Sequence, residues 1–287
     1  DHPRLAFLHL IASLCYMAGR IEAAVGYSDA AQEVIGSSRA EVPFGLEGFL
    51  GGSYVAVGQP ERWIRWCRAQ LARGLDTPAV TTACLLMGLL ATGSHDDAMV
   101  AADGLIDAAE ATGNPCVLSF ALHAYGWAVH EADPVRSLAA LRRGLAIAQD
   151  SGNRANQSNL ATNLCLFAEH DDPLAAFDYF TVAIGNYHDS GNTYMLRTLL
   201  GILAALVDRL GRYEPAATIA GFAVSSPVAA LPAMAAFGTA IAHLRDVLGE
   251  ATYESLARKG ETMTTAAMAT YAYDQIDQAR TTLEHPS

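Results

Sequence analysis

The chain has 287 residues, of which 52% are hydrophobic and 17% are charged. This composition supplies enough apolar material for a large core and excludes a disordered chain. The chain contains thirty acidic and eighteen basic residues, which gives a formal net charge of −12. That charge argues against direct binding of DNA or RNA, because such proteins need an excess of Lys and Arg to neutralise phosphates. We interpret it as a contribution to solubility.

The cysteines are far apart in the sequence, and no Cys-x-x-Cys motif occurs. Each lies among apolar neighbours at a helical position, which predicts reduced, buried thiols in a cytoplasmic protein. They are Cys15, Cys67, Cys84, Cys116 and Cys165. The sequence starts at Asp1 without a Met or a signal peptide, so we expect it to be part of a longer protein.

Two uncharged stretches, residues 77–94 and 215–242, are long enough to be considered as membrane spans. The first contains several Thr, and the second is interrupted by Pro227 and Pro232. Both are therefore predicted to be buried helices, and no membrane partner is expected.

A turn motif recurs along the chain and indicates a repeat. Thr112-Gly113-Asn114, Ser151-Gly152-Asn153 and Ser190-Gly191-Asn192 are 39 residues apart, and Gly74 and Gly36 continue the series toward the N-terminus. A second series of turns lies midway between them. It comprises Gly19-Arg20, Gly58-Gln59, His95-Asp96, Asp133-Pro134, Asp172-Pro173 and Gly211-Arg212. Two alternating series with this period are typical of an array of helical hairpins.

The residues at the turns support this register. Asn114, Asp133, Asp172 and Thr77 each precede a proline, the arrangement of a capping side chain followed by Pro at the first helical position. The glycines of the first series suit the left-handed residue that ends a helix.

Between the turns the apolar residues have helical spacing. Leu118, Ala121, Leu122, Tyr125 and Val129 follow an i, i+3, i+4 rhythm, which returns 39 and 78 residues later. Small residues at 126, 165 and 204 indicate close helix crossings. We predict an all-α, right-handed α-solenoid of about six hairpins over residues 1–226. A C-terminal helical cap is expected over 227–287, divided into two or three helices by Pro227, Pro232 and Gly260.

The segment from Asp172 to Ile184 resembles the second helix of a tetratricopeptide (TPR) repeat, and those beginning at Arg20 and Asp133 start similarly. The period of about 39 exceeds the 34-residue TPR consensus, so the superhelix need not match that family.

The last third of the chain carries a narrower resemblance. Leu210-Gly211-Arg212-Tyr213-Glu214 and the segments around Leu248 and Leu256 resemble the end of large actinobacterial, mycobacterial-type regulators. Those proteins join a nucleotide-cyclase or nucleotide-binding ATPase module to helical repeats, and some end in a LuxR-type helix-turn-helix. The maltose-regulon activator, with its sugar-sensing repeat domain, is a more distant analogue. The resemblance implies a neighbouring nucleotide-binding or cyclase module as a partner.

The sequence contains none of the catalytic motifs that such modules would carry. The single lysine, Lys259, does not complete a phosphate-binding G-x-x-x-x-G-K-[ST] loop, and H-E-x-x-H and G-x-S-x-G are absent. The triplets His95-Asp96-Asp97 and His170-Asp171-Asp172 fit helix caps better than metal sites. The pair His123 and His130 fits a structural role better than a metal site. No cofactor or metal is therefore expected.

Two surfaces are candidate binding sites. On one helix, Arg62, Arg65, Trp66 and Arg73 fall within an arc of about 100° and form a candidate face for an anion or an acidic partner. The alternative is a solvated outer face. The second surface is the concave side of the first helices, where side chains vary from repeat to repeat. Its candidate ligand-binding residues are His123, Trp127, Asn159, Thr162, Asn163 and Arg197.

These observations predict a non-catalytic sensor or regulatory region that binds a protein or a small polar ligand. It would belong to a multidomain signalling ATPase or transcriptional regulator. A free-standing scaffold for a peptide or protein partner is the first alternative. An all-α enzyme that uses Glu131 and Asp133 is the second.

Overall fold

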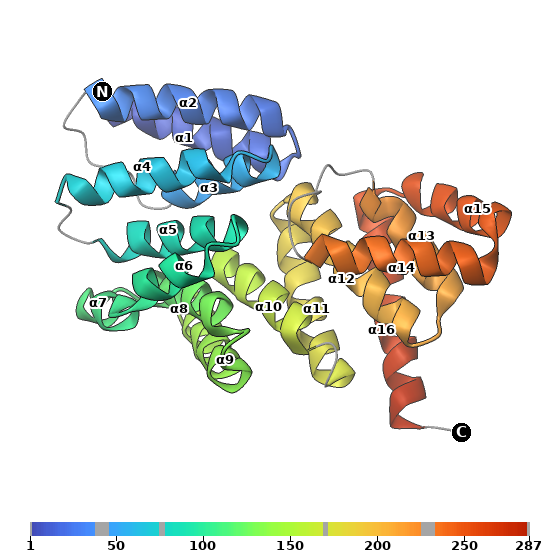
Figure 1. The fold of residues 1–287 in the computed structure, drawn as a ribbon. Coiled ribbons are helices and arrows are strands. Elements are labelled where there is room, and N and C mark those ends of the chain that lie inside the picture. The colour runs from blue at the N-terminus through green and yellow to red at the C-terminus, as the bar shows by residue number, and fades with distance from the viewer. Residues whose placement is uncertain (1, 38–45, 75–77, 169–171, 225–232, 286–287) are drawn as a thin grey trace. The chain divides into compact units, whose positions relative to one another are not determined.

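A computed structural model describes residues 2–37, 46–74, 78–168, 172–224 and 233–285, and these ranges contain helices and no strand (Figure 1). The all-α prediction is confirmed. The helices form two compact units, Asp1–Asn156 and Gln157–Ser287. The expected division at residue 226 therefore does not coincide with the division between compact units.

The first unit consists of consecutive helix pairs. They are α1 (His2–Met17) with α2 (Ile21–Ser37), α3 (Leu46–Ala56) with α4 (Pro60–Ala72), α5 (Ala79–Ala91) with α6 (His95–Ala102) and α7 (Leu105–Ala111), and α8 (Pro115–Val129) with α9 (Pro134–Asp150). The two members of each pair pack together, and the first helices also contact one another in the order α1, α3, α5, α8. Each pair thus buries its apolar faces against the next pair along the chain.

The second unit continues the pairs and adds three helices. α10 (Arg154–Ala168) starts just before the unit begins, and α11 (Pro173–Asp189), α12 (Thr193–Arg209) and α13 (Tyr213–Val224) follow. The C-terminal helices are α14 (Ala233–Leu248), α15 (Glu250–Glu261) and α16 (Thr265–Glu284). They pack on α12, α13 and α11 respectively, so all of them share one apolar core.

The turns lie where the repeat predicts them. Asn114, Asp133 and Asp172 accept hydrogen bonds from the backbone N–H groups of Cys116, Arg136 and Ala175 at 2.9, 2.9 and 3.0 Å. These caps satisfy N–H groups that a helix start leaves free. Their prediction is confirmed, whereas Thr77, His170, Asp171, Pro227 and Pro232 lie outside the described residues.

The glycines that end helices adopt the left-handed conformation, as Gly152 and Gly191 show with φ of 69° and 68°. A side chain would be strained there, which explains glycine at this point of the turn. Gly36 is an exception, and its assignment to a turn was wrong. It lies inside α2, which continues to Ser37 and keeps an ordinary helical φ at this position.

Two glycines allow α13 and α15 to cross in direct backbone contact. A Cβ atom on Gly260 would overlap the carbonyl oxygen of Thr218, and one on Gly221 would overlap that of Ala257. Gly260 lies in the last turn of α15, which ends at Glu261, so the expected helix boundary falls next to it. Its role is close packing, because only a residue without a side chain fits between the two backbones.

We expect Gly260→Ala to destabilise the protein by about 3 kcal/mol, because backbone atoms cannot move aside as a flexible side chain can. Gly238→Ala in α14 is the matched control. Among the described residues, a methyl group at position 238 would have no neighbouring atom within 4 Å, and alanine is the better helix former by about 1 kcal/mol. Urea unfolding of both variants measures the difference, and equal stability would show that α13 and α15 do not approach this closely.

Candidate functional site

The candidate site in the second unit is a polar strip on α10. Thr162 is buried, and its hydroxyl donates to the carbonyl of Ser158 at 2.8 Å and lies 3.2 Å from the hydroxyl of Tyr187. Tyr187, on α11, donates to Oδ1 of Asn159 at 3.2 Å. Burial raises the pKa of Tyr187, so the hydroxyl keeps its proton and remains a donor. This network fixes the amide of Asn159 in one orientation.

Asn163 lies one helical turn beyond Asn159 on the same strip. Its side-chain Nδ2 is buried, and among the described residues no group accepts a hydrogen bond from it. A buried amide donor without an acceptor costs free energy, so few remain in folded proteins. An acceptor supplied by a ligand would satisfy this group. Asn163 is therefore the position on the strip with unused hydrogen-bonding capacity.

Arg197 does not lie open to a ligand. Its Nη1 donates to the carbonyl of Phe222 at 2.7 Å, and the guanidinium lies 4.4 Å from the centre of the Phe222 ring. Burial lowers the pKa of Arg197 from its usual value. The side chain therefore attaches α12 to α13, a role that the repeat pattern does not reveal.

His123 and Trp127 belong to the first unit, so the six predicted residues divide between the two units. His123 is only 5% exposed, and Trp127 is half-buried. Burial lowers the pKa of His123 to about 4, because the charged imidazolium cannot be solvated.

The variable positions of the first helices are mostly packed rather than open. Ser119, Ser158 and Thr198 are 0–2% exposed, and Gly201 is covered by the ring of Phe237. Their variation from repeat to repeat therefore reflects how neighbouring helices fit together. The prediction of an open concave surface at these positions is corrected accordingly.

The depressed pKa of His123 predicts loss of stability in acid. The unfolded chain takes up this proton near pH 6.5 and the folded chain only near pH 4, so stability falls as the pH drops between these values. We expect His123→Gln to remove on the order of 3 kcal/mol from the acid-dependent loss. Denaturant unfolding at about pH 7 and about pH 4.5 measures it. The exposed His285→Gln variant is the control, and an unchanged pH dependence in His123→Gln would contradict the assignment.

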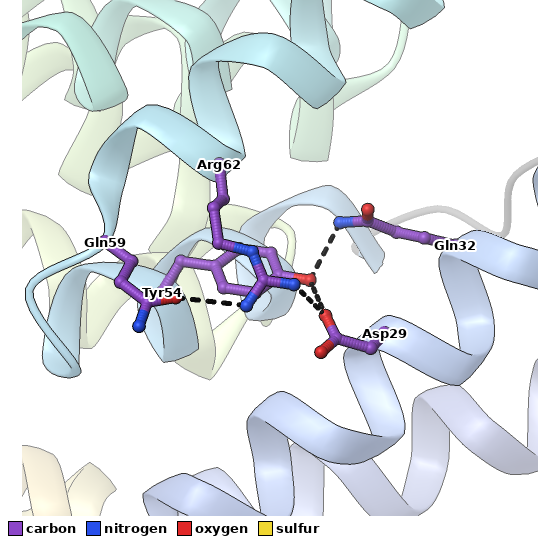
Figure 2. A network of polar contacts seen from close by, with 5 residues as sticks. All are labelled: Asp29, Gln32, Tyr54, Gln59 and Arg62. Carbon is purple, nitrogen blue, oxygen red and sulfur yellow. Dashed lines mark hydrogen bonds and ion pairs between the residues drawn. The ribbon is translucent and has the colours of Figure 1, made fainter.

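The cationic face of α4 contains a network around Arg62, shown in Figure 2. Nη2 of Arg62 lies 2.5 Å from Oδ1 of Asp29, and Tyr54 donates to the same oxygen at 2.6 Å. Gln32 donates to the hydroxyl of Tyr54, and Gln59 accepts from Nη1 of Arg62. The guanidinium also lies 4.4 Å from the centre of the Tyr54 ring, a cation–π contact. The network joins α2, α3 and α4.

The other residues of this face differ in exposure. Trp66 is 7% exposed and packs with Cys67 in the core, whereas Arg65 and Arg73 are exposed, and Arg73 donates to Gln70 at 3.2 Å. The cations therefore do not surround an open indole. Arg62 is already neutralised by Asp29, so Arg65 and Arg73 are the positions of this face that remain turned to solvent.

We expect Arg62→Met to lower the free energy of unfolding by about 1 kcal/mol, because it removes a partly solvated ion pair and a cation–π contact. Arg65→Met should leave stability unchanged. Chemical unfolding of both variants in low and high salt measures the effect. Equal stability of the two variants would show that Arg62 is not part of an internal network.

Several residues of these polar networks could not be identified from the sequence pattern. Asp29 and Tyr54 lie 33 and 8 residues from Arg62, which is not the repeat spacing. Tyr187 had a weak signal, because it takes the place of Ala148 one period earlier. A buried acid was also missed. Asp208 is 6% exposed and its carboxylate lies 2.9 and 3.0 Å from Nδ1 of His243, joining α12 to α14.

Three acidic residues of the motifs considered for catalysis have structural partners. Asp133 and Asp172 cap helices, and Asp97 lies 3.4 Å from Arg68. In the described ranges, no three His, Cys, Asp or Glu side chains gather as they would around a metal ion. Cys67, Cys84 and Cys165 are buried, as predicted, whereas Cys15 and Cys116 are partly exposed.

No protein-family model matches this chain, and no curated protein matches it significantly. Within the part of the chain that the structure describes, no helix has the length and apolar character needed to cross a bilayer.

Proposed function

We propose that this chain is a TPR-like, right-handed α-solenoid that binds a peptide or a small polar ligand. Regular spacing supports the repeat. α8, α10 and α12 begin at Pro115, Arg154 and Thr193, which are 39 residues apart, and α9 and α11 begin at Pro134 and Pro173, again 39 apart. Contacts between successive first helices in the first unit also fit stacked hairpins.

The observation that carries the binding proposal is the buried Nδ2 of Asn163, which has no acceptor among the described residues. Beside it, Asn159 is oriented by Tyr187 and remains half-buried. A rigid amide next to an unused donor suits a ligand with carbonyl, carboxylate or hydroxyl oxygens, such as a peptide backbone or a sugar.

In the proposed role the chain is the non-catalytic sensor region of a multidomain signalling ATPase or transcriptional regulator. A ligand there changes the packing of a neighbouring nucleotide-binding or cyclase module. The ligand has this effect only if it binds two conformational states of the sensor region with different affinities. The resemblance of the C-terminal third to such regulators supports this role.

The test compares Asn163→Leu with Asn159→Leu. We expect Asn163→Leu to abolish binding without loss of stability, because it removes an amide that has no acceptor in the folded chain. Asn159→Leu should cost about 1 kcal/mol, because the hydroxyl of Tyr187 loses its acceptor. Binding is measured on an immobilised random peptide library and by calorimetry with a panel of mono- and disaccharides.

Two results would count against the proposal. If no peptide or sugar binds the unmodified protein, the chain is not this kind of receptor. If ligands bind equally well to Asn163→Leu, the strip on α10 is not the site.

A further inference from the structure

A surface histidine on α14 is held by a buried carboxylate on α12. Nδ1 of His243 lies 2.9 and 3.0 Å from the two carboxylate oxygens of Asp208. The side chain of Asp208 is 6% exposed, whereas that of His243 is 47% exposed. The two helices pack against each other in the second unit, so the pair begins in a helix-to-helix contact and ends at the surface.

The position of the ring proton follows from this hydrogen bond. An ionised carboxylate only accepts hydrogen bonds, so Nδ1 carries the proton that it donates. A neutral imidazole has one N–H group, which leaves Nε2 with a free lone pair. Nε2 has no hydrogen-bond partner among the described residues. His243 therefore presents a lone pair to solvent.

The imidazole is also held by a neighbouring ring. The ring of Tyr213 meets that of His243 edge to face, with 5.7 Å between the ring centres and an interplanar angle of 76°. Aromatic rings favour this arrangement. The ring contact and the hydrogen bond together keep the imidazole in one orientation, in which Nδ1 faces Asp208 and Nε2 points away from it.

A second histidine of the same unit lacks a buried acid and serves as a reference. The side chain of His188 is 38% exposed, and its Nδ1 lies 3.4 Å from Oδ1 of Asp189. The side chain of Asp189 is 54% exposed, so water competes for this contact. His188 is thus similar to His243 in accessibility but has no buried carboxylate behind its ring.

An accessible Nε2 with a buried carboxylate behind the ring suits a nucleophilic histidine. Histidine forms covalent intermediates through the lone pair of a ring nitrogen. Attack by Nε2 places positive charge on the ring, and a carboxylate at Nδ1 stabilises that charge. A general base would need a substrate bound beside Nε2, whereas a phosphoryl acceptor needs only an accessible lone pair. The exposure of His243 provides that access.

We propose that His243 accepts a phosphoryl group on Nε2 from a donor with a phosphorus–nitrogen bond, such as the phosphohistidine of another protein. The Nε2 lone pair forms a bond to phosphorus, and the phosphorus–nitrogen bond of the donor breaks with its electron pair on the donor nitrogen. Nδ1 keeps its proton and its hydrogen bond to Asp208, which is a positioning residue. The site is separate from the strip on α10 and does not depend on ligand binding at Asn163.

Phosphoramidate, a small donor with such a bond, tests the proposal on the whole chain. Nε2 takes its phosphoryl group, and its nitrogen leaves as ammonia. Mass spectrometry of peptides follows labelling of His243 and His188 in the same sample over time. We expect His243 to be labelled at least about tenfold faster than His188, because only His243 has a buried carboxylate at Nδ1. Phosphorus NMR with nitrogen-15 labelling should place the group on Nε2.

Matched variants separate a positioned nucleophile from a purely structural helix contact. Asp208→Asn keeps the size of the side chain, but its amide can donate to Nδ1 and so places the ring proton on Nε2, where it blocks attack. We expect labelling of His243 to fall at least about tenfold in this variant. Asp189→Asn makes the same change beside His188 and should leave labelling of His243 unchanged. His243→Gln should lose the fast label, and circular dichroism confirms that each variant is folded.

The proposal is overturned if His243 and His188 are labelled at equal rates or if the phosphoryl group is found on Nδ1. It is also overturned if a folded Asp208→Asn variant is labelled as fast as the unmodified chain, since the pair would then be only a contact between helices. If Asp208→Asn does not fold, the comparison of His243 with His188 in the unmodified chain still decides.

Discussion

The structure depends on the burial of apolar helix faces between successive helix pairs. A single helix pair cannot enclose a core of its own, because two helices leave part of their apolar faces exposed unless the next pair covers them. In the second unit, Phe177 and Phe180 of α11, Leu203 of α12 and Phe222 of α13 are almost completely buried by one another's helices. Stability is therefore shared between neighbouring helix pairs.

Several polar residues serve this packing. Arg62 joins α2, α3 and α4 through Asp29 and the ring of Tyr54, and Arg197 joins α12 to α13 through a carbonyl and an aromatic face. Arg212 likewise donates to the carbonyl of Gln275 on α16. Arginine suits these positions because its planar group stacks on rings and donates several hydrogen bonds at once. The presence of a cationic side chain on one of these packed helices therefore does not by itself indicate ligand binding.

The two proposed sites of this chain use different physical principles and lie on different helices. The strip on α10 offers hydrogen bonds at a half-buried site, where a buried donor without an acceptor favours a ligand with matching oxygens. The pair of Asp208 and His243 offers a lone pair at the surface, because a buried carboxylate keeps the ring proton on the opposite nitrogen. Either site can therefore be changed by mutation without altering the other.

The helical class, the hairpin order and the turn positions follow from the amino-acid sequence, because caps such as Asp133 and glycines such as Gly152 act through local backbone geometry. The partners of individual polar side chains depend instead on how the helices pack. The sequence marks Arg197, Asn159 and Asn163 alike as polar residues of the predicted binding surface. In the structure Arg197 donates to a backbone carbonyl and Asn159 accepts a hydrogen bond from a tyrosine, whereas Nδ2 of Asn163 has no acceptor among the described residues. Those partners lie on other helices, at distances along the chain that local periodicity does not encode. The burial of Asp208 and the close approach at Gly260 likewise depend on tertiary packing, because a neighbouring helix covers some surfaces and leaves others exposed.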